Sequence, residues 1–222
     1  MKKIKNALVI LAGGIGTRFG KKLPKQFIEI NGENLIQFFL RRIDTTNFNI
    51  IVIVHKKSYS KYINKIKINF PSNQFLFVNA GKNRQQSSFN GLIKLKQYQP
   101  ENVLIHDAAR PFVGKGLITK SLDQLKTNVA VCPGLPLTDT IASVTNNKVS
   151  KIIDREKVYR LQTPQSFNFK ILSKCHNMID ESVTDDISII LHFGYVPKII
   201  KGSDKNMKIT YKSDLKIIKS LI

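Results

Sequence analysis

The sequence is poor in cysteine and has no long apolar run, and both absences narrow what the protein can be. Cys132 and Cys175 are the only cysteines among 222 residues, and no Cys-x-x-Cys pair or Cys/His cluster occurs. A disulfide framework and a structural zinc site are therefore not expected, which fits a reducing cytoplasm. No segment approaches the roughly eighteen consecutive apolar residues of a membrane-spanning helix, and the apolar run behind the basic N-terminus stops at Gly13. We therefore expect neither a membrane span nor a signal peptide.

Acidic residues are scarce as well: 15 Asp and Glu face 36 Lys and Arg, which gives a net charge of +21. A charge of this size is typical of nucleic-acid-binding proteins. The lysines are, however, spread over the whole length without a long block, and no nucleic-acid-binding motif occurs. A general lysine bias explains the same pattern. We therefore do not expect nucleic acid as a partner, although the charge would attract anionic substrates.

A glycine-rich segment follows the first apolar run of the chain. Residues 11–26 read LAGGIGTRFGKKLPKQ and come directly after the apolar residues 7–10. Glycines let backbone N–H groups approach phosphate oxygens, and the basic side chains of this segment can neutralise further charge. Three residues separate Gly16 from Gly20, which is one too many for the dinucleotide fingerprint and one too few for the P-loop. Two interpretations remain: the signature loop of nucleotidyltransferases, or an ordinary glycine-rich turn.

Short apolar runs alternate with segments of helical periodicity, which predicts an α/β fold with a mostly parallel sheet. We expect one domain over residues 1–222, with strands at 7–12, 50–55, 75–79, 103–106 and 129–133 and helices at 35–43, 59–66, 84–95 and 117–126. In such sheets ligands bind at the carboxyl ends of the strands. Polar and glycine-rich segments do follow the predicted strands, so we expect the chemistry to gather there.

Asp107 directly follows the strand predicted over 103–106. Magnesium prefers oxygen ligands and commonly takes one or two carboxylates together with substrate phosphates. An acid at this strand end, in a site otherwise suited to phosphate, is therefore a candidate Mg²⁺ ligand. The alternatives for Asp107 are a helix N-cap and an ion-pair partner for Arg110.

A series of short motifs continues along the chain beyond the glycine-rich segment. They are PKQ at 24–26, Gly81 with Arg84 and Ser87, HDAARP at 106–111, Asp-Thr at 139–140, Asp-Arg at 154–155, QTPQ at 162–165, TDD at 184–186 and NMKIT at 206–210. With these motifs the chain resembles, over essentially its full length, the 2-C-methyl-D-erythritol 4-phosphate cytidylyltransferases of the non-mevalonate isoprenoid pathway. The resemblance implies a Rossmann-like three-layer α/β sandwich.

The family's reaction is the transfer of CMP from CTP to the substrate phosphate, with release of pyrophosphate. The attacking phosphate oxygen is already anionic at neutral pH, so alignment and charge stabilisation are expected to carry catalysis. By resemblance, Arg18 and Lys25 flank the α-phosphate and Lys208 is a third cation near the triphosphate. The remaining implied residues are Ala12, Gly13 and Gly14 along the nucleotide, Gly81 and Ser87 at the cytosine, Asp107 on Mg²⁺, and Arg110, Thr140, Arg155 and Thr184 around the methylerythritol phosphate.

Residues 137–158 are expected to form a β-arm, because two short strands at 141–144 and 149–152 flank a polar turn. An isolated hairpin is marginally stable in water and needs a surface to pack against. The resemblance implies an arm that reaches across a two-fold homodimer, so that Thr140 and Arg155 complete the partner's site. A hairpin folded on its own subunit is the alternative.

The chain departs from the family pattern in places. It reads Leu-Ala-Gly-Gly at 11–14 where Pro-Ala-Ala-Gly is usual, and Lys82 stands where an acid is frequent. The nearest alternative is a ribitol-5-phosphate cytidylyltransferase, which shares most of the motifs. An alternative of another class is a basic nucleic-acid-binding module on a degenerate nucleotidyltransferase fold. Some members are fused to a later enzyme of the pathway. The 222 residues do not encode that second domain, so we expect the chain to be either monofunctional or a piece of a longer protein.

Overall fold

The computed structural model describes residues 4–16, 19, 24–70 and 74–220, and it contains an eight-stranded mixed sheet. The strands lie in the order β10-β7-β11-β6-β1-β4-β5, and β12 also pairs with β7. β6, β1, β4 and β5 are parallel to one another, whereas β11 runs antiparallel to both of its neighbours. The strand bounds are β1 Asn6–Leu11, β4 Ile50–His55, β5 Gln74–Asn79, β6 Asn102–Asp107, β7 Ala130–Pro136, β10 Tyr159–Leu161, β11 Gln165–Asn168 and β12 Lys198–Lys201.

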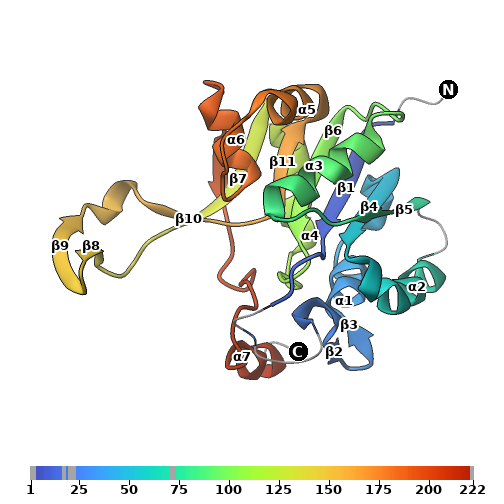
Figure 1. The fold of residues 1–222 in the computed structure, drawn as a ribbon, viewed down its shortest axis with the longest axis horizontal. Helices are drawn as coiled ribbons and strands as arrows, with labels where there is room; N and C mark the ends of the chain where they lie inside the picture. Colours follow the sequence, from blue (N-terminus) through green and yellow to red (C-terminus); the bar gives the residue numbers. More distant parts are fainter. Residues whose placement is uncertain (1–3, 17–18, 20–23, 71–73, 221–222) are drawn as a thin grey trace.

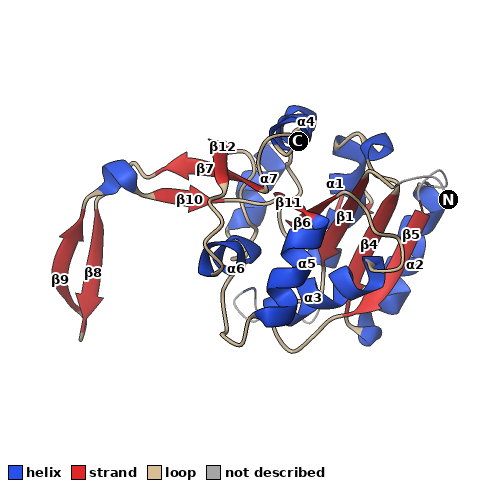
Figure 2. Cartoon of the chain, turned by 90° about the horizontal axis from the view of Figure 1, so that it is seen from above, coloured by secondary structure: helices blue, strands red, loops and turns tan. Residues whose placement is uncertain are grey.

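Helices cover both faces of this sheet and make a three-layer sandwich (Figure 2). Leu8 and Ile10 of β1 pack into a buried cluster with side chains of α1, α2 and α4. The alternate residues Ala7 and Val9 pack into a second cluster with α3, α5 and α6. Because both faces of the central strands are buried, these strands read as continuous apolar runs. The helix bounds are α1 Leu35–Arg42, α2 Ser60–Asn69, α3 Arg84–Leu95, α4 Lys115–Gln124, α5 Phe169–Met178, α6 Asp186–His192 and α7 Asp214–Ser220.

The predicted α/β class and mostly parallel sheet are confirmed. The five predicted strands correspond to β1, β4, β5, β6 and β7, and the four predicted helices to α1, α2, α3 and α4, with ends that differ by a few residues. The sequence prediction did not include β10, β11, β12 or the helices after residue 168. It also omitted the two-residue strands β2 (Glu29–Ile30) and β3 (Glu33–Asn34), which pair with each other.

The predicted hairpin is present as β8 (Ile141–Thr145) and β9 (Lys148–Ile153), which pair antiparallel in a separate two-stranded sheet. Asn146 and Asn147 both have positive φ, 49° and 60°, as a tight two-residue hairpin turn requires. The hairpin projects away from the body of the molecule (Figure 1). Val144, Val149 and Ile152 on it are 61%, 67% and 59% exposed, so the arm carries apolar surface into solvent.

Candidate active site

A cleft of about 410 Å³ opens at the carboxyl ends of β1, β5 and β6, where the sequence pattern predicted it. The segments that follow these strands and the segment that precedes α7 contribute most of its lining. Seven of the predicted site residues line it: Gly13, Gly14, Lys25, Gly81, Ser87, Asp107 and Lys208. The cleft therefore brings together the cations, the acid and the glycines from five separate motifs.

The buried side chain of Gln26 holds the glycine-rich loop after β1 in place. Its Nε2 donates to the carbonyl oxygens of Ala12 at 2.6 Å and Gly14 at 2.8 Å. Ala12 also donates its N–H to Val54 O at 2.8 Å, so it lies behind the cleft lining, with its own polar backbone groups engaged in the fold. A Cβ on Gly13 would lie 2.3 Å from Ala80 Cβ, which explains why this position has no side chain.

Two of the predicted catalytic cations reach the cleft, and the third cannot be placed. Lys25 precedes Gln26 in a short 3-10 turn, and its Nζ donates to the carbonyl oxygen of Ile209 at 2.5 Å. Lys208 lies next to Ile209, which is fully buried and donates its N–H to Ala109 O at 2.9 Å. This anchoring joins the segment before α7 to the loop after β6. Arg18 lies outside the described residues.

The loop between β5 and α3 has an internal hydrogen-bond network around Ser87. Gly81 N–H donates to Ser87 Oγ at 3.1 Å, and Ser87 Oγ donates to Asn83 O at 2.8 Å. Asn83 is the N-cap of α3, and its Oδ1 accepts from Gln86 N at 2.8 Å. Ser87 therefore fixes the shape of the loop that lines one wall of the cleft, and its hydroxyl remains at that wall.

Asp107 forms two ion pairs at the cleft floor. Arg84 Nε lies 3.2 Å from its Oδ1, and Lys208 Nζ lies 2.6 Å from its Oδ2. Burial alone would raise the pKa of Asp107, but the two cations outweigh burial and hold that pKa well below its ordinary value. Arg110, considered as a partner from the sequence, instead donates from Nη1 to Asn206 O at 2.8 Å. The carboxylate is therefore ionised, and Asp107 lies in the lining of the cleft.

Arg84 connects the cleft floor to a fully buried carboxylate, and sequence reasoning did not assign this role. Its Nη1 lies 2.7 Å from Asp186 Oδ2, while Ser88 Oγ and His176 Nε2 contact the other oxygen of Asp186 at 2.6 and 2.9 Å. The two carboxylates raise the pKa of Arg84 above its ordinary value, although burial by itself lowers it. Arg84 and Asp186 both lie in motifs noted in the sequence, and membership of these motifs was the one sequence signal that could have indicated their role.

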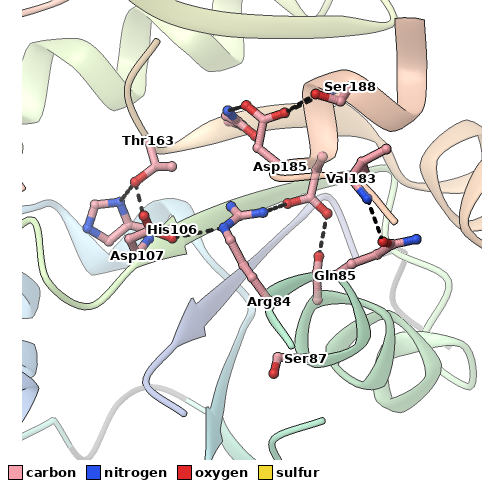
Figure 3. Close-up of polar contacts among 12 residues, drawn as sticks. Arg84, Gln85, Ser87, His106, Asp107, Thr163, Val183, Asp185 and Ser188 are labelled. Carbon is pink, nitrogen blue, oxygen red and sulfur yellow. Dashed lines mark hydrogen bonds and ion pairs between the residues drawn. The ribbon is translucent and has the colours of Figure 1, made fainter. Parts of the chain in front are cut away.

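His106 is neutral and structural. Burial lowers its pKa to about 3. Its Nε2 faces the carbonyl of Arg110 at 3.0 Å and therefore carries the proton, while Nδ1 accepts from Thr163 Oγ1 at 3.0 Å. The same Thr163 oxygen accepts the N–H of Asp107 at 3.1 Å, as Figure 3 shows. His106 and Thr163 thus orient the strand end that presents Asp107.

The four residues predicted for the acceptor substrate do not line the cleft. Thr140 is exposed at the base of the arm, and Arg155 bonds the carbonyl of Thr138 there. Thr184 lies in the loop between α5 and α6, and Arg110 lies in the loop after β6. Within one subunit, the cleft therefore contains most of the residues predicted for the nucleotide and none of the four predicted for the acceptor.

None of the helices in the described part of the chain is both long and apolar enough to span a bilayer.

Known proteins are similar to this chain over nearly its whole length. A sequence model described as IspD, 2-C-methyl-D-erythritol 4-phosphate cytidylyltransferase, matches residues 6–222. A protein of that name from Thermosipho melanesiensis is 37% identical over 96% of this chain and 96% of its own length. The bifunctional enzyme IspD/IspF of Pelagibacter ubique is also 37% identical, over 95% of this chain, which spans 56% of that relative's length.

A solved structure has the same fold. The 4-diphosphocytidyl-2C-methyl-D-erythritol synthase of Anaerococcus prevotii superposes with a TM-score of 0.85 at 26% identity and covers 99% of both chains. The resemblance drawn from the motifs is thus confirmed by sequence and by fold. The chain belongs to the IspD family of 2-C-methyl-D-erythritol 4-phosphate cytidylyltransferases.

Proposed function

We propose that the protein transfers CMP from CTP to 2-C-methyl-D-erythritol 4-phosphate and releases pyrophosphate. The observation that carries this proposal is the convergence of Lys25, Lys208 and Asp107 with Gly13 and Gly14 on one cleft. Two cations and the backbone of two glycines suit a triphosphate. Family membership supplies the identity of the nucleotide and of the acceptor.

The reaction needs no general base from the protein. An acceptor phosphate oxygen attacks the α-phosphorus of CTP, and the bond from that phosphorus to the bridging oxygen breaks, so that pyrophosphate leaves with its electron pair. The attacking oxygen is already ionised at neutral pH. In the proposed reaction, Lys25 and Lys208 hold and align the phosphates and stabilise the charge that develops on them. Arg18 keeps the role that the resemblance implies.

Magnesium is the proposed cofactor, with Asp107 as its one protein ligand. No group of three or more His, Cys, Asp or Glu side chains that could hold a metal ion occurs within the described ranges. A single carboxylate fits Mg²⁺ where substrate phosphates supply further ligands. Bound there, the ion would neutralise charge on the phosphates. Arg84 keeps Asp107 ionised and oriented, and Lys208 shares the same carboxylate.

A homodimer is the proposed assembly, in a cytoplasmic enzyme. The exposed apolar side chains of β8 and β9 suit a subunit contact. Thr140 and Arg155 at the base of the arm lie apart from the cleft of their own subunit. A two-fold contact would give each cleft these two residues from the partner subunit, since both copies then exchange arms.

A pyrophosphate-release screen tests the proposed reaction. The purified chain is supplied with Mg²⁺, each of the four ribonucleoside triphosphates, and either methylerythritol phosphate or ribitol 5-phosphate. We expect release with CTP and methylerythritol phosphate and much slower release in every other combination. Faster release with ribitol 5-phosphate would change the proposed acceptor to ribitol 5-phosphate, while the proposed transfer of CMP from CTP would stand. No release with CTP and either acceptor would refute the proposal.

A further inference from the structure

Two neighbouring glutamines at the start of α3 reach toward different loops. Gln86 Oε1 accepts the N–H of Lys82 at 3.0 Å. Gln85 Oε1 accepts the N–H of Val183 at 3.0 Å, and its Nε2 donates to Glu181 O at 3.0 Å. Neither glutamine lines the cleft. Adjacent positions on a helix point about 100° apart, which lets one turn contact two separate segments.

Gln86 supports the wall of the nucleotide cleft. Lys82 and Gly81 both line that cleft, and the bond from Gln86 closes the loop that carries them. A Cβ on Gly81 would lie 2.5 Å from Gln86 Cβ, so the glutamine side chain packs directly against this loop. The contact thus sets the position of the Gly81 backbone, which the resemblance assigns to the cytosine.

Gln85 supports the segment that carries Thr184. Thr184 lies between two fixed neighbours: Val183, held through its N–H by Gln85, and Asp185, the N-cap of α6. Asp185 Oδ1 accepts the N–H of Ser188 at 3.0 Å. Figure 3 shows Gln85 directed at Val183, with Asp185 and Ser188 bonded to each other farther along the same segment.

We propose that Gln85 and Gln86 are positioning residues that serve the two substrates separately. Gln86 fixes the loop that receives the nucleotide, and Gln85 fixes the loop that presents Thr184 to the acceptor phosphate. The proposal rests on the reaction proposed above and on the place beside the methylerythritol phosphate that the family resemblance implies for Thr184. It accounts for two adjacent polar side chains that do not line the cleft yet make specific bonds to two separate loops.

Paired kinetic measurements test this division. Methionine keeps the length of glutamine but removes both polar atoms, so Gln85→Met and Gln86→Met each delete one set of bonds. We expect Gln85→Met to raise KM for methylerythritol phosphate about three- to tenfold with KM for CTP unchanged, and Gln86→Met to do the reverse. Gln124→Met, on α4 and outside the cleft lining, is the matched control and should change neither. Equal changes in both KM values for both variants, or none, would overturn the proposal.

Amide hydrogen exchange gives a readout that does not depend on turnover. The N–H of Val183 should exchange faster in Gln85→Met alone, and the N–H of Lys82 faster in Gln86→Met alone, by about three- to tenfold. If the variants show this exchange pattern but wild-type protein has no activity, the proposed reaction is refuted, whereas the positioning of the two loops by Gln85 and Gln86 is supported. If wild-type protein is active but neither substitution changes exchange at Val183 or Lys82, only the positioning roles of Gln85 and Gln86 are refuted.

Discussion

Lys208 Nζ lies 2.6 Å from Oδ2 of Asp107, an ion pair between residues 101 positions apart in the sequence. The pair joins the segment before α7 to the end of β6 at the cleft floor. Lys208→Met keeps much of the side-chain length and removes the charge. We expect kcat to fall roughly 10²- to 10³-fold, because the proposed reaction then loses a preorganised cation that would stabilise developing phosphate charge. Steady-state assays of pyrophosphate release measure kcat for the variant and the wild type.

The matched control for this prediction is Lys205→Met, an exposed lysine three residues earlier on the same segment. It removes the same charge from the chain without touching the cleft lining. We expect its kcat to stay within about twofold of wild type, as for most surface substitutions. Equal losses in the two variants would show that overall charge, rather than the contact at Asp107, supports turnover.

The central fold was predictable because its strands are buried on both faces. β1, β4 and β6 read as continuous apolar runs, and glycines or polar residues mark their ends. β10 and β12 gave no such signal: all three residues of β10 are exposed, and Ile200 is the one buried residue of β12. These strands form only because β7 offers them hydrogen-bonding partners, which a local pattern does not encode.

The same distinction, between what a local sequence pattern encodes and what tertiary packing decides, applies to the site. Lys25 and Asp107 lie in glycine-rich or charged motifs, so the sequence predicted both as site residues, and the structure brings both to the cleft. The bond from Arg84 to Asp186 spans 102 positions and depends on how α3 and α6 pack. No spacing rule links such residues, so the support beneath Asp107 emerges only from the fold.

Gly13 is expected to tolerate no side chain, for steric reasons. A Cβ there would lie 2.3 Å from Ala80 Cβ, and Ala80 is itself held by its N–H bond to His55 O at 2.9 Å. Gly13→Ala should lower the free energy of unfolding by about 1–3 kcal/mol, the usual cost of overpacking. Urea denaturation measures this loss.

Gly14 is the matched control, because a Cβ there meets nothing within 4 Å. We expect Gly14→Ala to change the free energy of unfolding by less than about 0.5 kcal/mol. If both alanine variants lose the same stability, backbone conformation rather than the contact with Ala80 decides the preference for glycine.

Asp186 predicts a specific dependence of stability on pH. Burial opposes its ionisation, but Arg84, followed by the bonds from His176 and Ser88, lowers its pKa from 3.8 to about 2. Because the folded-state pKa lies below the unfolded value, ionised Asp186 stabilises the fold above about pH 4, and this contribution is lost as the pH falls toward 2. Asp186→Asn should cost about 3–5 kcal/mol at pH 7.

Urea denaturation of both proteins between pH 7 and pH 2 measures this dependence. We expect the gap in unfolding free energy between wild type and Asp186→Asn to be constant down to about pH 4 and to narrow below it. A gap that stays constant to pH 2 would mean that Asp186 does not titrate differently in the folded protein.

If subunits exchange arms as proposed, two defective variants should restore each other's activity. Lys208→Met damages the variant's own cleft, whereas Arg155→Ala damages only the arm that would serve the partner subunit. In a hybrid dimer, the cleft of the Arg155→Ala subunit keeps Lys208 and receives an intact arm. Coexpression in equal amounts should make about half of the dimers hybrid, with one intact site each, and restore about a quarter of wild-type activity.

The control for this experiment pairs Lys208→Met with Asp107→Asn, because both changes fall in the cleft of their own subunit. No hybrid of these two variants contains an intact site, so we expect no recovery beyond the sum of the separate activities. The contrast between the two pairs isolates the contribution of the arm. If the first pair also shows no recovery although hybrid dimers are isolated, Arg155 serves its own subunit, and the hairpin is not exchanged between active sites.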